Sequence, residues 1–166
     1  MAGEFYKKLN LCVRRHRILR DLVLICNERL VIPVALVYLA GIFSELSNGD
    51  RKGTVLLIAV PAAAFLAITV LRKAIGRPRP YNELDISPIV ARVRESCSMP
   101  SRHVGSAFAI GSVLTALAHP VLGAIVLALG VVIAASRVLG GVHYLTDVTA
   151  GAVIGLLSGV AAYLLK

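Results

Sequence analysis

The residues best suited to chemistry lie in the stretch 136–147, Ser-Arg-Val-Leu-Gly-Gly-Val-His-Tyr-Leu-Thr-Asp, between two long apolar segments. Charged side chains at a membrane boundary are costly to place there and are usually functional. His143 and Asp147 are four residues apart. This spacing lets a carboxylate orient an imidazole and make it a better nucleophile. The alternative interpretation is a short polar loop that joins two membrane helices.

Two cationic clusters precede this stretch. The first, 72–80, carries four Lys or Arg side chains within eight residues. It is either a phosphate clamp, because guanidinium groups bind phosphate oxygens bidentately, or a charge cluster that ends a span and binds headgroups. The second, 99–103, begins an apolar segment with Ser101, Arg102 and His103. Free N–H groups at a helix start favour an anion there, although His103 alone is more often an ordinary polar residue.

Together the three clusters contain several arginines, two histidines and one carboxylate partner. Metal-dependent phosphate chemistry uses clustered carboxylates, but the nearby Glu83, Asp85 and Glu95 follow no ligand spacing. We therefore predict no metal and no cofactor. The residues fit metal-free phosphoryl transfer, in which arginines neutralise the phosphate, one histidine attacks and the other protonates the leaving oxygen.

The composition indicates that these residues are positioned by a membrane protein. The chain is 57% hydrophobic and 16% charged, whereas soluble domains are about 45–50% apolar and about 25% charged. Its net charge of +9 lies beside the apolar segments. This placement favours anionic or phosphate-bearing lipids as partners over nucleic acid. The three cysteines have no disulfide-framework or zinc-site spacing.

The apolar pattern predicts an all-α, polytopic membrane helical bundle of about five transmembrane helices, preceded by a basic amphipathic surface helix over about 4–20. We divide the chain into a surface segment, 1–21, and a single membrane-embedded domain, 22–166. The glycines in the last span recur every four residues, which permits close helix packing. The predicted spans are 22–43, 54–71, 101–118, 121–139 and 148–165.

Five spans would put the N-terminus, the 72–99 loop and the 136–147 stretch on one side of the membrane. Outside the motifs, this face keeps eight cations, six in the N-terminal segment plus Arg92 and Arg94, against three on the other face. The positive-inside rule therefore favours a cytoplasmic site.

The three clusters resemble the motifs of the type 2 phosphatidic acid phosphatase superfamily, which also includes the vanadium haloperoxidases. Those motifs are Lys-x6-Arg-Pro, Pro-Ser-Gly-His and Ser-Arg-x5-His-x3-Asp. This chain has, in the same order, Arg72-x6-Arg79-Pro80, Pro100-Ser101-Arg102-His103 and Ser136-Arg137-x5-His143-x3-Asp147. Arg72 stands where the family has lysine, with Lys73 beside it, and Arg102 replaces the family glycine.

The resemblance implies a membrane phosphatase that hydrolyses a phosphomonoester or pyrophosphate of a lipid. It assigns attack on phosphorus to His143, orientation of that histidine to Asp147, and proton transfer to His103. The residues implied in phosphate binding are Arg72, Arg79, Ser101 and Arg137, joined by Arg102 and Lys73.

Several points stay open at this stage. Phosphatidic acid, phosphatidylglycerophosphate and undecaprenyl diphosphate are all compatible substrates, and the oligomeric state is undetermined. The resemblance also allows an extracytoplasmic site, because many family members work on the outer face. The alternative functions are a lipid phosphotransferase with the same site and a non-catalytic membrane protein that binds anionic lipid.

Overall fold

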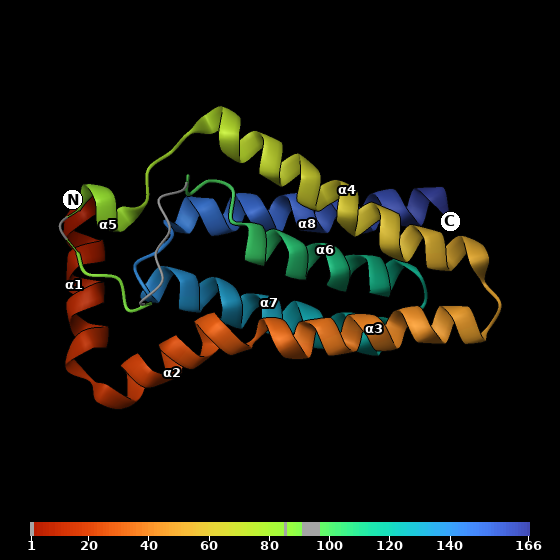
Figure 1. Ribbon diagram of the computed structural model, residues 1–166, viewed down its shortest axis with the longest axis horizontal. Helices are drawn as coiled ribbons and strands as arrows, with labels where there is room; N and C mark the ends of the chain where they lie inside the picture. The colour runs from red at the N-terminus through yellow and green to blue at the C-terminus, as the bar shows by residue number, and fades with distance from the viewer. Residues whose placement is uncertain (1, 85, 91–96) are drawn as a thin grey trace.

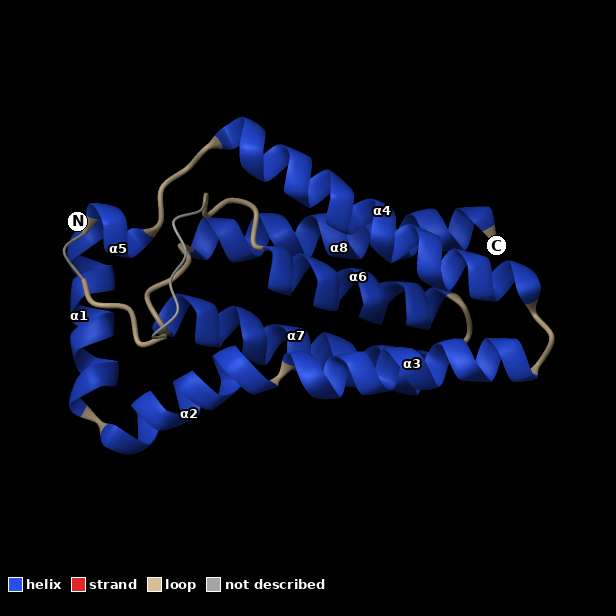
Figure 2. Ribbon diagram, in the orientation of Figure 1, coloured by secondary structure: helices blue, strands red, loops and turns tan. Residues whose placement is uncertain are grey.

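The computed structural model describes residues 2–84, 86–90 and 97–166, so Asp85, Arg92, Arg94 and Glu95 lie outside the described residues. Within these ranges the chain is helical and forms no strand (Figures 1 and 2). The helices are α1 (Ala2–Arg15), α2 (Arg17–Arg29), α3 (Val31–Ser47), α4 (Arg51–Ile75), α5 (Pro80–Glu83), α6 (Arg102–Ala116), α7 (Pro120–Leu139) and α8 (Leu145–Leu165).

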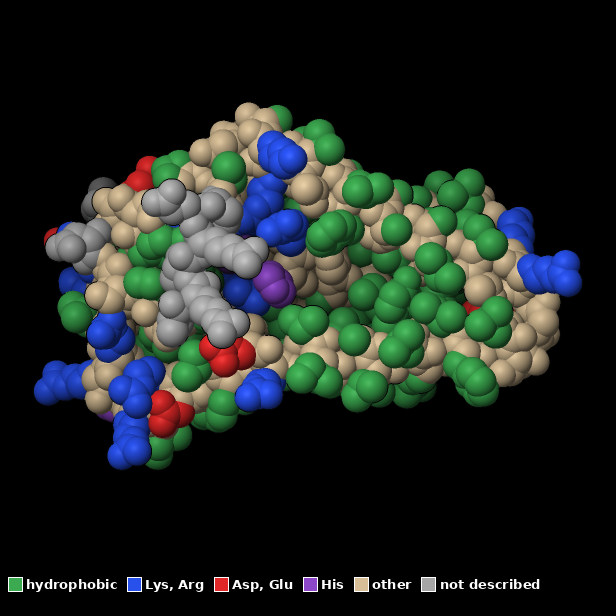
Figure 3. Space-filling model, viewed as in Figure 1, with side chains coloured by type: hydrophobic (Ala, Val, Ile, Leu, Met, Phe, Trp, Pro, Cys, Tyr) green, Lys and Arg blue, Asp and Glu red, His purple; other side chains and the backbone are tan. Residues whose placement is uncertain are grey.

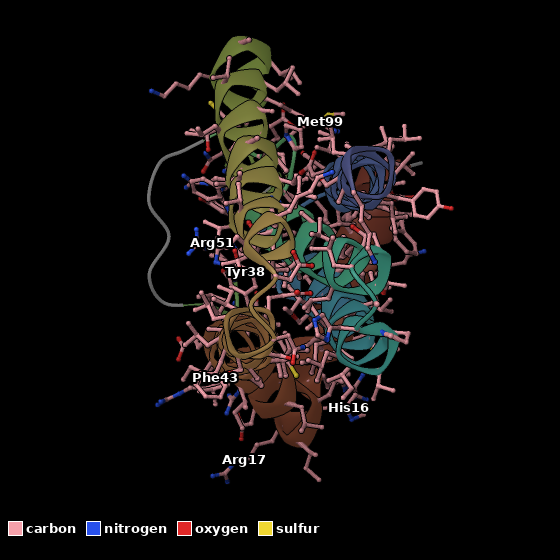
Figure 4. All side chains as sticks on the ribbon, turned by 90° about the vertical axis from the view of Figure 1, so that its right-hand side faces the viewer. His16, Arg17, Tyr38, Phe43, Arg51 and Met99 are labelled. Atoms are coloured by element: carbon pink, nitrogen blue, oxygen red, sulfur yellow. The ribbon has the colours of Figure 1, made fainter. Side chains whose placement is uncertain are left out.

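Five helices, α3, α4, α6, α7 and α8, run along the long axis of the molecule, and α1 lies across one end of them (Figure 1). Figure 4 looks along this axis from the end that holds the α3–α4 turn. In that view Tyr38 lies between α3 and α4, where its hydroxyl donates to the carbonyl oxygen of Leu57 over 2.9 Å. Helix α6 packs against α4, α7 and α8 and forms the centre of the bundle.

The surface of the bundle is apolar along its length. In the described chain, four helical segments are long and apolar enough to cross a membrane: Arg17–Ser47, Arg51–Glu83, Pro120–Leu139 and Leu145–Leu165. Large apolar side chains face outward from them, and Phe43 is 73% exposed. An apolar surface of this extent is stable in lipid, where helices satisfy their own backbone groups. The chain is an integral membrane protein, and the predicted all-α membrane bundle is confirmed.

The predicted span 101–118 differs from the other four. It forms α6, whose 15 residues correspond to about 22 Å, less than the roughly 30 Å hydrocarbon core of a bilayer. The helix stops at Ala116, and Ala118 adopts a positive φ of 72° before α7 begins. Because α6 is enclosed by its neighbours, Val104, Val113 and Leu114 are fully buried. The described residues therefore contain four candidate spans and one shorter internal helix, where the sequence predicted about five spans.

The N-terminal region also differs from the prediction of one surface helix followed by one span. Helix α1 ends at Arg15, because His16 has extended backbone angles (φ −101°, ψ 103°) and the chain turns there. Helix α2 then runs obliquely toward the bundle (Figure 1). A second break at Leu30 separates α2 from α3. The domain boundary after residue 21 falls within α2, and the division into two parts stays a prediction.

The glycines of α8 bring it into close contact with α6. A Cβ atom added at Gly151 would lie 2.6 Å from the carbonyl oxygen of Ser101, and one at Gly155 would lie 2.5 Å from the Cβ of Phe108. Any larger residue would push the two helices apart. This contact sets the first turn of α6 beside the first turn of α8, so it positions two of the three motif clusters.

Candidate active site

His143 lies in the loop between α7 and α8, and its ring meets a carboxylate one turn later. The His143 Nδ1 atom is 3.4 Å from Oδ2 of Asp147. The two side chains are 2% and 0% exposed. Oδ2 also accepts the backbone N–H of Tyr144 over 2.9 Å, so Asp147 caps the start of α8. The pairing of Nδ1 with the carboxylate makes Nε2 the nitrogen that can present a lone pair.

Burial dominates the ionisation of this histidine. It lowers the pKa of His143 to about 4, against the opposing effect of the hydrogen bond to Asp147. The ring is therefore neutral at physiological pH. A neutral imidazole is the form that can act as a nucleophile.

Arg77 binds the other oxygen of the orienting carboxylate. Its guanidinium donates to Oδ1 of Asp147 over 3.1 Å and to the hydroxyl of Thr146 over 2.6 Å. It also lies 4.1 Å from the centre of the Tyr144 ring. Sequence reasoning counted Arg77 only as a cation of the 72–80 cluster. Its position inside that cluster was the only signal of a role.

Arg72 connects the first motif to the second. The side chain is 5% exposed and donates to the carbonyl oxygens of Ser98 (3.1 Å) and Pro100 (2.9 Å), and also to that of Cys97. The hydroxyl of Ser98 donates to the carbonyl oxygen of Pro78 over 3.0 Å. These bonds hold the segment that leads into α6 against the end of α4.

The second motif meets the third through the backbone. The N–H of Ser101 donates to the carbonyl oxygen of Asp147 over 2.9 Å. The Ser101 hydroxyl is buried and has no hydrogen-bond partner within the described part of the chain. His103 follows on the first turn of α6, is exposed, and is close enough to interact electrostatically with Arg137 and His143. A donor and a second histidine therefore lie beside the His143–Asp147 pair.

Two more arginines, Arg79 and Arg137, complete what we call the arginine cage, together with Arg72. Arg79 donates to the carbonyl oxygen of Val142 over 3.2 Å, next to His143. Arg137 donates to the carbonyl oxygen of Asn27 over 3.1 Å. The buried Nε of Arg137 has no partner among the residues described. Two arginines of the cage, Arg72 and Arg79, interact electrostatically with His143, and Arg137 interacts with His103.

Asn27 and Glu83 support the site in ways that the sequence did not specify. The Asn27 amide donates to the carbonyl oxygen of Ser136 over 2.8 Å, which joins α2 to α7. Asn27 is a polar residue inside the predicted span 22–43, but the sequence does not indicate its partner. Glu83 accepts a hydrogen bond from the hydroxyl of Tyr144. Burial and this bond raise the pKa of Tyr144 above its ordinary value, so its hydroxyl stays protonated.

An apolar hollow of about 320 Å³ begins at His103 and Arg102. We call it the tail hollow. Its walls come from α3, α4, α6 and α7 and include Val34, Phe65 and Ile133. Figure 3 shows Lys, Arg and His side chains gathered near the start of α6, with hydrophobic side chains extending from them along the bundle.

The predicted phosphate-binding residues do not all gather around His143. Lys73 is exposed and shares with Arg102 a second hollow on the side of α4. No group of three or more His, Cys, Asp or Glu side chains is placed to hold a metal ion within the described ranges. The absence of a metal or cofactor from the reaction stays a prediction.

The bundle and its site define a helical membrane protein with a buried histidine–carboxylate pair inside a cage of arginines. The chain belongs to the PAP2 superfamily, whose family model matches residues 53–166, a range that contains all three motifs. The resemblance seen in the sequence is thereby confirmed.

Two solved structures are similar in fold. Aquifex aeolicus LpxE has a TM-score of 0.69 and 23% identity, over 96% of this chain and 92% of that chain. The first transmembrane PAP2 type phosphatidylglycerolphosphate phosphatase from Bacillus subtilis has a TM-score of 0.69 and 24% identity, over 97% of this chain and 82% of that chain. Among curated proteins, none matches this chain in sequence.

Proposed function

We propose that this protein is a metal-independent lipid phosphatase that hydrolyses a phosphomonoester or pyrophosphate of a membrane lipid through a phosphohistidine intermediate. One observation carries the proposal. A neutral, carboxylate-oriented histidine lies inside a cage of arginines, next to a second histidine that opens onto an apolar hollow.

In the first step, Nε2 of His143 attacks phosphorus while the bond from phosphorus to the leaving oxygen breaks. Asp147 accepts a hydrogen bond from Nδ1–H and stabilises the positive charge that develops on the ring. Burial and the neighbouring arginines lower the pKa of His103 to about 3, and the negative charge of a bound phosphate opposes this shift and favours the protonated ring. The protonated His103 gives its proton to the leaving oxygen, which departs as a lipid alcohol or a lipid monophosphate. The arginine cage neutralises the phosphoryl oxygens, and the Ser101 hydroxyl, which has no partner among the described residues, supplies a further donor.

In the second step, His103 is neutral and accepts a proton from water. The hydroxide attacks the phosphohistidine, the N–P bond breaks, and inorganic phosphate leaves. Nε2 of His143 regains its lone pair and His103 regains its proton, so the enzyme returns to its starting state. Each histidine thus acts in both steps without a metal ion.

The tail hollow supports a lipid as the carrier of the phosphate. It is lined by apolar residues of four helices and has cationic and imidazole side chains at one end. An acyl or isoprenyl chain there would keep its contact with apolar surface while its headgroup meets His103. The named activity of the Bacillus subtilis relative, on phosphatidylglycerolphosphate, is compatible with such a substrate.

The proposed site lies at the end of the bundle that carries α1, so its side of the membrane follows that of the N-terminus. The six cations of 7–20 favour the cytoplasm by the positive-inside rule. Cys12 is exposed on α1 and reports the side directly. In a Cys26→Ser/Cys97→Ser background, a membrane-impermeant maleimide should label Cys12 only after the cytoplasmic face is opened. Labelling in intact cells would place the site outside.

The function is tested with purified protein in detergent, lipid phosphates and excess EDTA. We expect release of inorganic phosphate, and a ³²P label on the protein after acid-free quenching with a labelled substrate. His143→Gln should lower release by more than about 10⁴-fold, because it removes the nucleophile. His119→Gln, which changes the histidine at the opposite end of the bundle, is the matched control and should retain activity.

Three results would contradict the proposal in different ways. Unchanged release from His143→Gln would exclude the assigned nucleophile. Transfer of the label to an alcohol acceptor in preference to water would indicate a phosphotransferase. Binding of lipid phosphate without any release would leave a non-catalytic lipid-binding protein.

A further inference from the structure

A second hollow opens beside the proposed active site, on the α4 side of α6. It has a volume of about 200 Å³ and is lined by Thr69, Arg72, Lys73, Cys97 and Arg102. We call it the basic hollow. Three of the five described residues that line it are cations, whereas the described wall of the tail hollow is mostly apolar.

Two of the cations in the basic hollow, Lys73 and Arg102, have no ion-pair partner among the residues that the structure describes. The guanidinium carbon of Arg102 lies 6.0 Å from the centre of the Phe65 ring, which is a weak contact. Cations gathered in a concave surface attract an anion, and a phosphate is the best match for guanidinium and ammonium together.

The basic hollow is adjacent to the site of phosphoryl transfer. Arg102 forms part of both hollows and directly precedes His103 in the chain. Arg72 belongs to the arginine cage and also lines the basic hollow. A ligand phosphate in the basic hollow would therefore lie one side chain away from a phosphate bound in the cage.

We propose that the basic hollow is a second anion subsite, which binds a second phosphate group of the lipid substrate through Lys73 and Arg102. The inference rests on the proposed function and narrows its substrate class to lipids with two phosphates in the headgroup. Arg102, which replaces the glycine of the family motif, and Lys73 then select the substrate, while the cage holds the transferred group.

Two kinds of lipid share this chemistry. In a polyprenyl diphosphate, the terminal phosphate would be transferred and the inner phosphate would occupy the subsite. In a phosphatidylglycerophosphate, the terminal monoester would be transferred and the phosphodiester would occupy it. Matched pairs with a single phosphate exist for both, and these pairs separate the two sources.

The test compares kcat/KM for farnesyl diphosphate with farnesyl phosphate, and for phosphatidylglycerophosphate with phosphatidic acid of the same acyl chains. The readout is the ratio within each pair, because a misfolded fraction lowers both values alike. In Lys73→Gln/Arg102→Gln we expect the ratio of at least one pair to fall about tenfold, since two charge-assisted contacts to the second phosphate are lost. Lys8→Gln, an exposed lysine on α1, should leave both ratios unchanged.

The outcomes separate this inference from the function on which it rests. A fall in the farnesyl ratio alone means that the subsite binds the inner phosphate of a diphosphate, directly bonded to the transferred group. A fall in the phosphatidyl ratio alone means that it binds the phosphodiester, which the glycerol separates from the transferred group. Equal losses of kcat/KM on one-phosphate and two-phosphate substrates in both pairs would overturn the subsite. They would mean that Lys73 and Arg102 bind the transferred phosphate instead. Absence of hydrolysis of all four lipids by the unmodified protein would overturn the function itself.

Discussion

Each end of the bundle contains a histidine paired with a buried carboxylate. At the motif end, His143 Nδ1 lies 3.4 Å from Asp147, and at the opposite end His119 Nε2 lies 2.7 Å from Oε1 of Glu45. Asp147 is 0% exposed and Glu45 is 5% exposed. By the distance between histidine and carboxylate alone, the second pair is as good a candidate for chemistry as the first.

The surroundings of the two carboxylates differ in the partners that they provide. Asp147 accepts from Arg77, and its histidine partner interacts with Arg72 and Arg79. Glu45 instead shares its neighbourhood with another carboxylate. A Cβ atom added at Gly53 would meet Asp50 Oδ2 at 2.6 Å and Glu45 Oε2 at 2.7 Å. No Lys or Arg within the described ranges forms an ion pair with Glu45, whereas the arginine cage attracts phosphate.

The difference shows that a histidine–carboxylate pair becomes a candidate nucleophile through the groups around it. The pair at the opposite end joins the C-terminal turn of α3 to the α6–α7 connection, and its role is structural. Sequence spacing separates the two cases as well. His143 and Asp147 are one turn apart, while 74 positions separate His119 from Glu45.

Replacement of each carboxylate by its amide should separate the two pairs most strongly. Asp147→Asn can no longer hold the Nδ1–H tautomer of His143, and we expect kcat to fall by about 10²- to 10⁴-fold. Glu45→Gln should retain kcat, since it can still accept a hydrogen bond from His119. Phosphate release per mole of folded protein, with folding checked by gel filtration, measures both. Similar losses of kcat in the two variants would show that the two histidine–carboxylate pairs do not differ in function.

The ionisation of His143 provides a second test. Because burial holds its pKa at about 4 instead of 6.5, about nine-tenths of the rings should be neutral at pH 5, against about 3% for an ordinary histidine. At pH 5 the fraction of His143 in the neutral, nucleophilic form is therefore about 30 times that of an ordinary histidine. ¹⁵N NMR of histidine-labelled protein should show a neutral ring at pH 5, with the signal assigned by its loss in His143→Gln.

The same shift affects stability. Between pH 6.5 and about 4, His143 is protonated in the unfolded chain but neutral in the folded chain. The contribution of His143 to the free energy of unfolding is therefore complete above pH 6.5 and falls as the pH drops through this window. His143→Gln should flatten the decline of Tm over this range. An NMR midpoint near 6.5 would contradict both expectations.

Arg77 is a positioning residue that acts through Asp147. Arg77→Gln removes the guanidinium group that lies 3.1 Å from Oδ1 of Asp147. We expect kcat to fall about tenfold and KM to change less. The NMR signal of His143 should shift because its carboxylate partner loses an ion pair. Arg77→Lys should restore part of the activity. A change confined to KM would instead mean that Arg77 binds the substrate.

Much of the site could be predicted because its signals are local. The spacing of His143 and Asp147 specifies an i, i+4 pair, and alternating spans bring distant clusters to one end of a bundle. The contact of Arg77 with Asp147 spans 70 positions. No local pattern distinguishes Arg77 from the other cations of its cluster, so that contact could not be predicted.

The positions at which the N-terminal helices end could not be predicted from the sequence pattern either. Neither His16 nor Leu30 is a helix breaker by type, and the turns there depend on where α1 and α2 pack. Asn10 of α1, for example, donates to the carbonyl oxygen of Ser87 over 3.1 Å, a contact across 77 positions. The length of α6 likewise depends on the turn at Ala118, where a non-glycine residue adopts a positive φ.

A substitution at Tyr6 should have the smallest effect on kcat that still distinguishes the motif end of the bundle from the opposite end. Its hydroxyl accepts the N–H of Leu145 over 3.0 Å, and its ring lies edge-on to Tyr144, with 5.2 Å between ring centres. Tyr6→Phe keeps the ring contact but leaves this N–H without its acceptor, which should cost about 0.5–1.5 kcal/mol of stability. Because Leu145 begins α8 two residues after His143, we also expect kcat to fall about twofold to threefold.

The matched change at the opposite end is Thr54→Val, which removes the hydrogen bond from the Thr54 hydroxyl to the carbonyl oxygen of Asp50 (2.8 Å). It should cost a similar amount of stability, because one hydrogen bond is lost in each variant, and it should leave kcat unchanged. Thermal unfolding and steady-state phosphate release measure the two effects separately. If both variants lower Tm alike but neither alters kcat, α1 supports the fold without influencing the loop that holds His143. A fall in kcat for Tyr6→Phe alone would show that the surface helix helps to position the nucleophile.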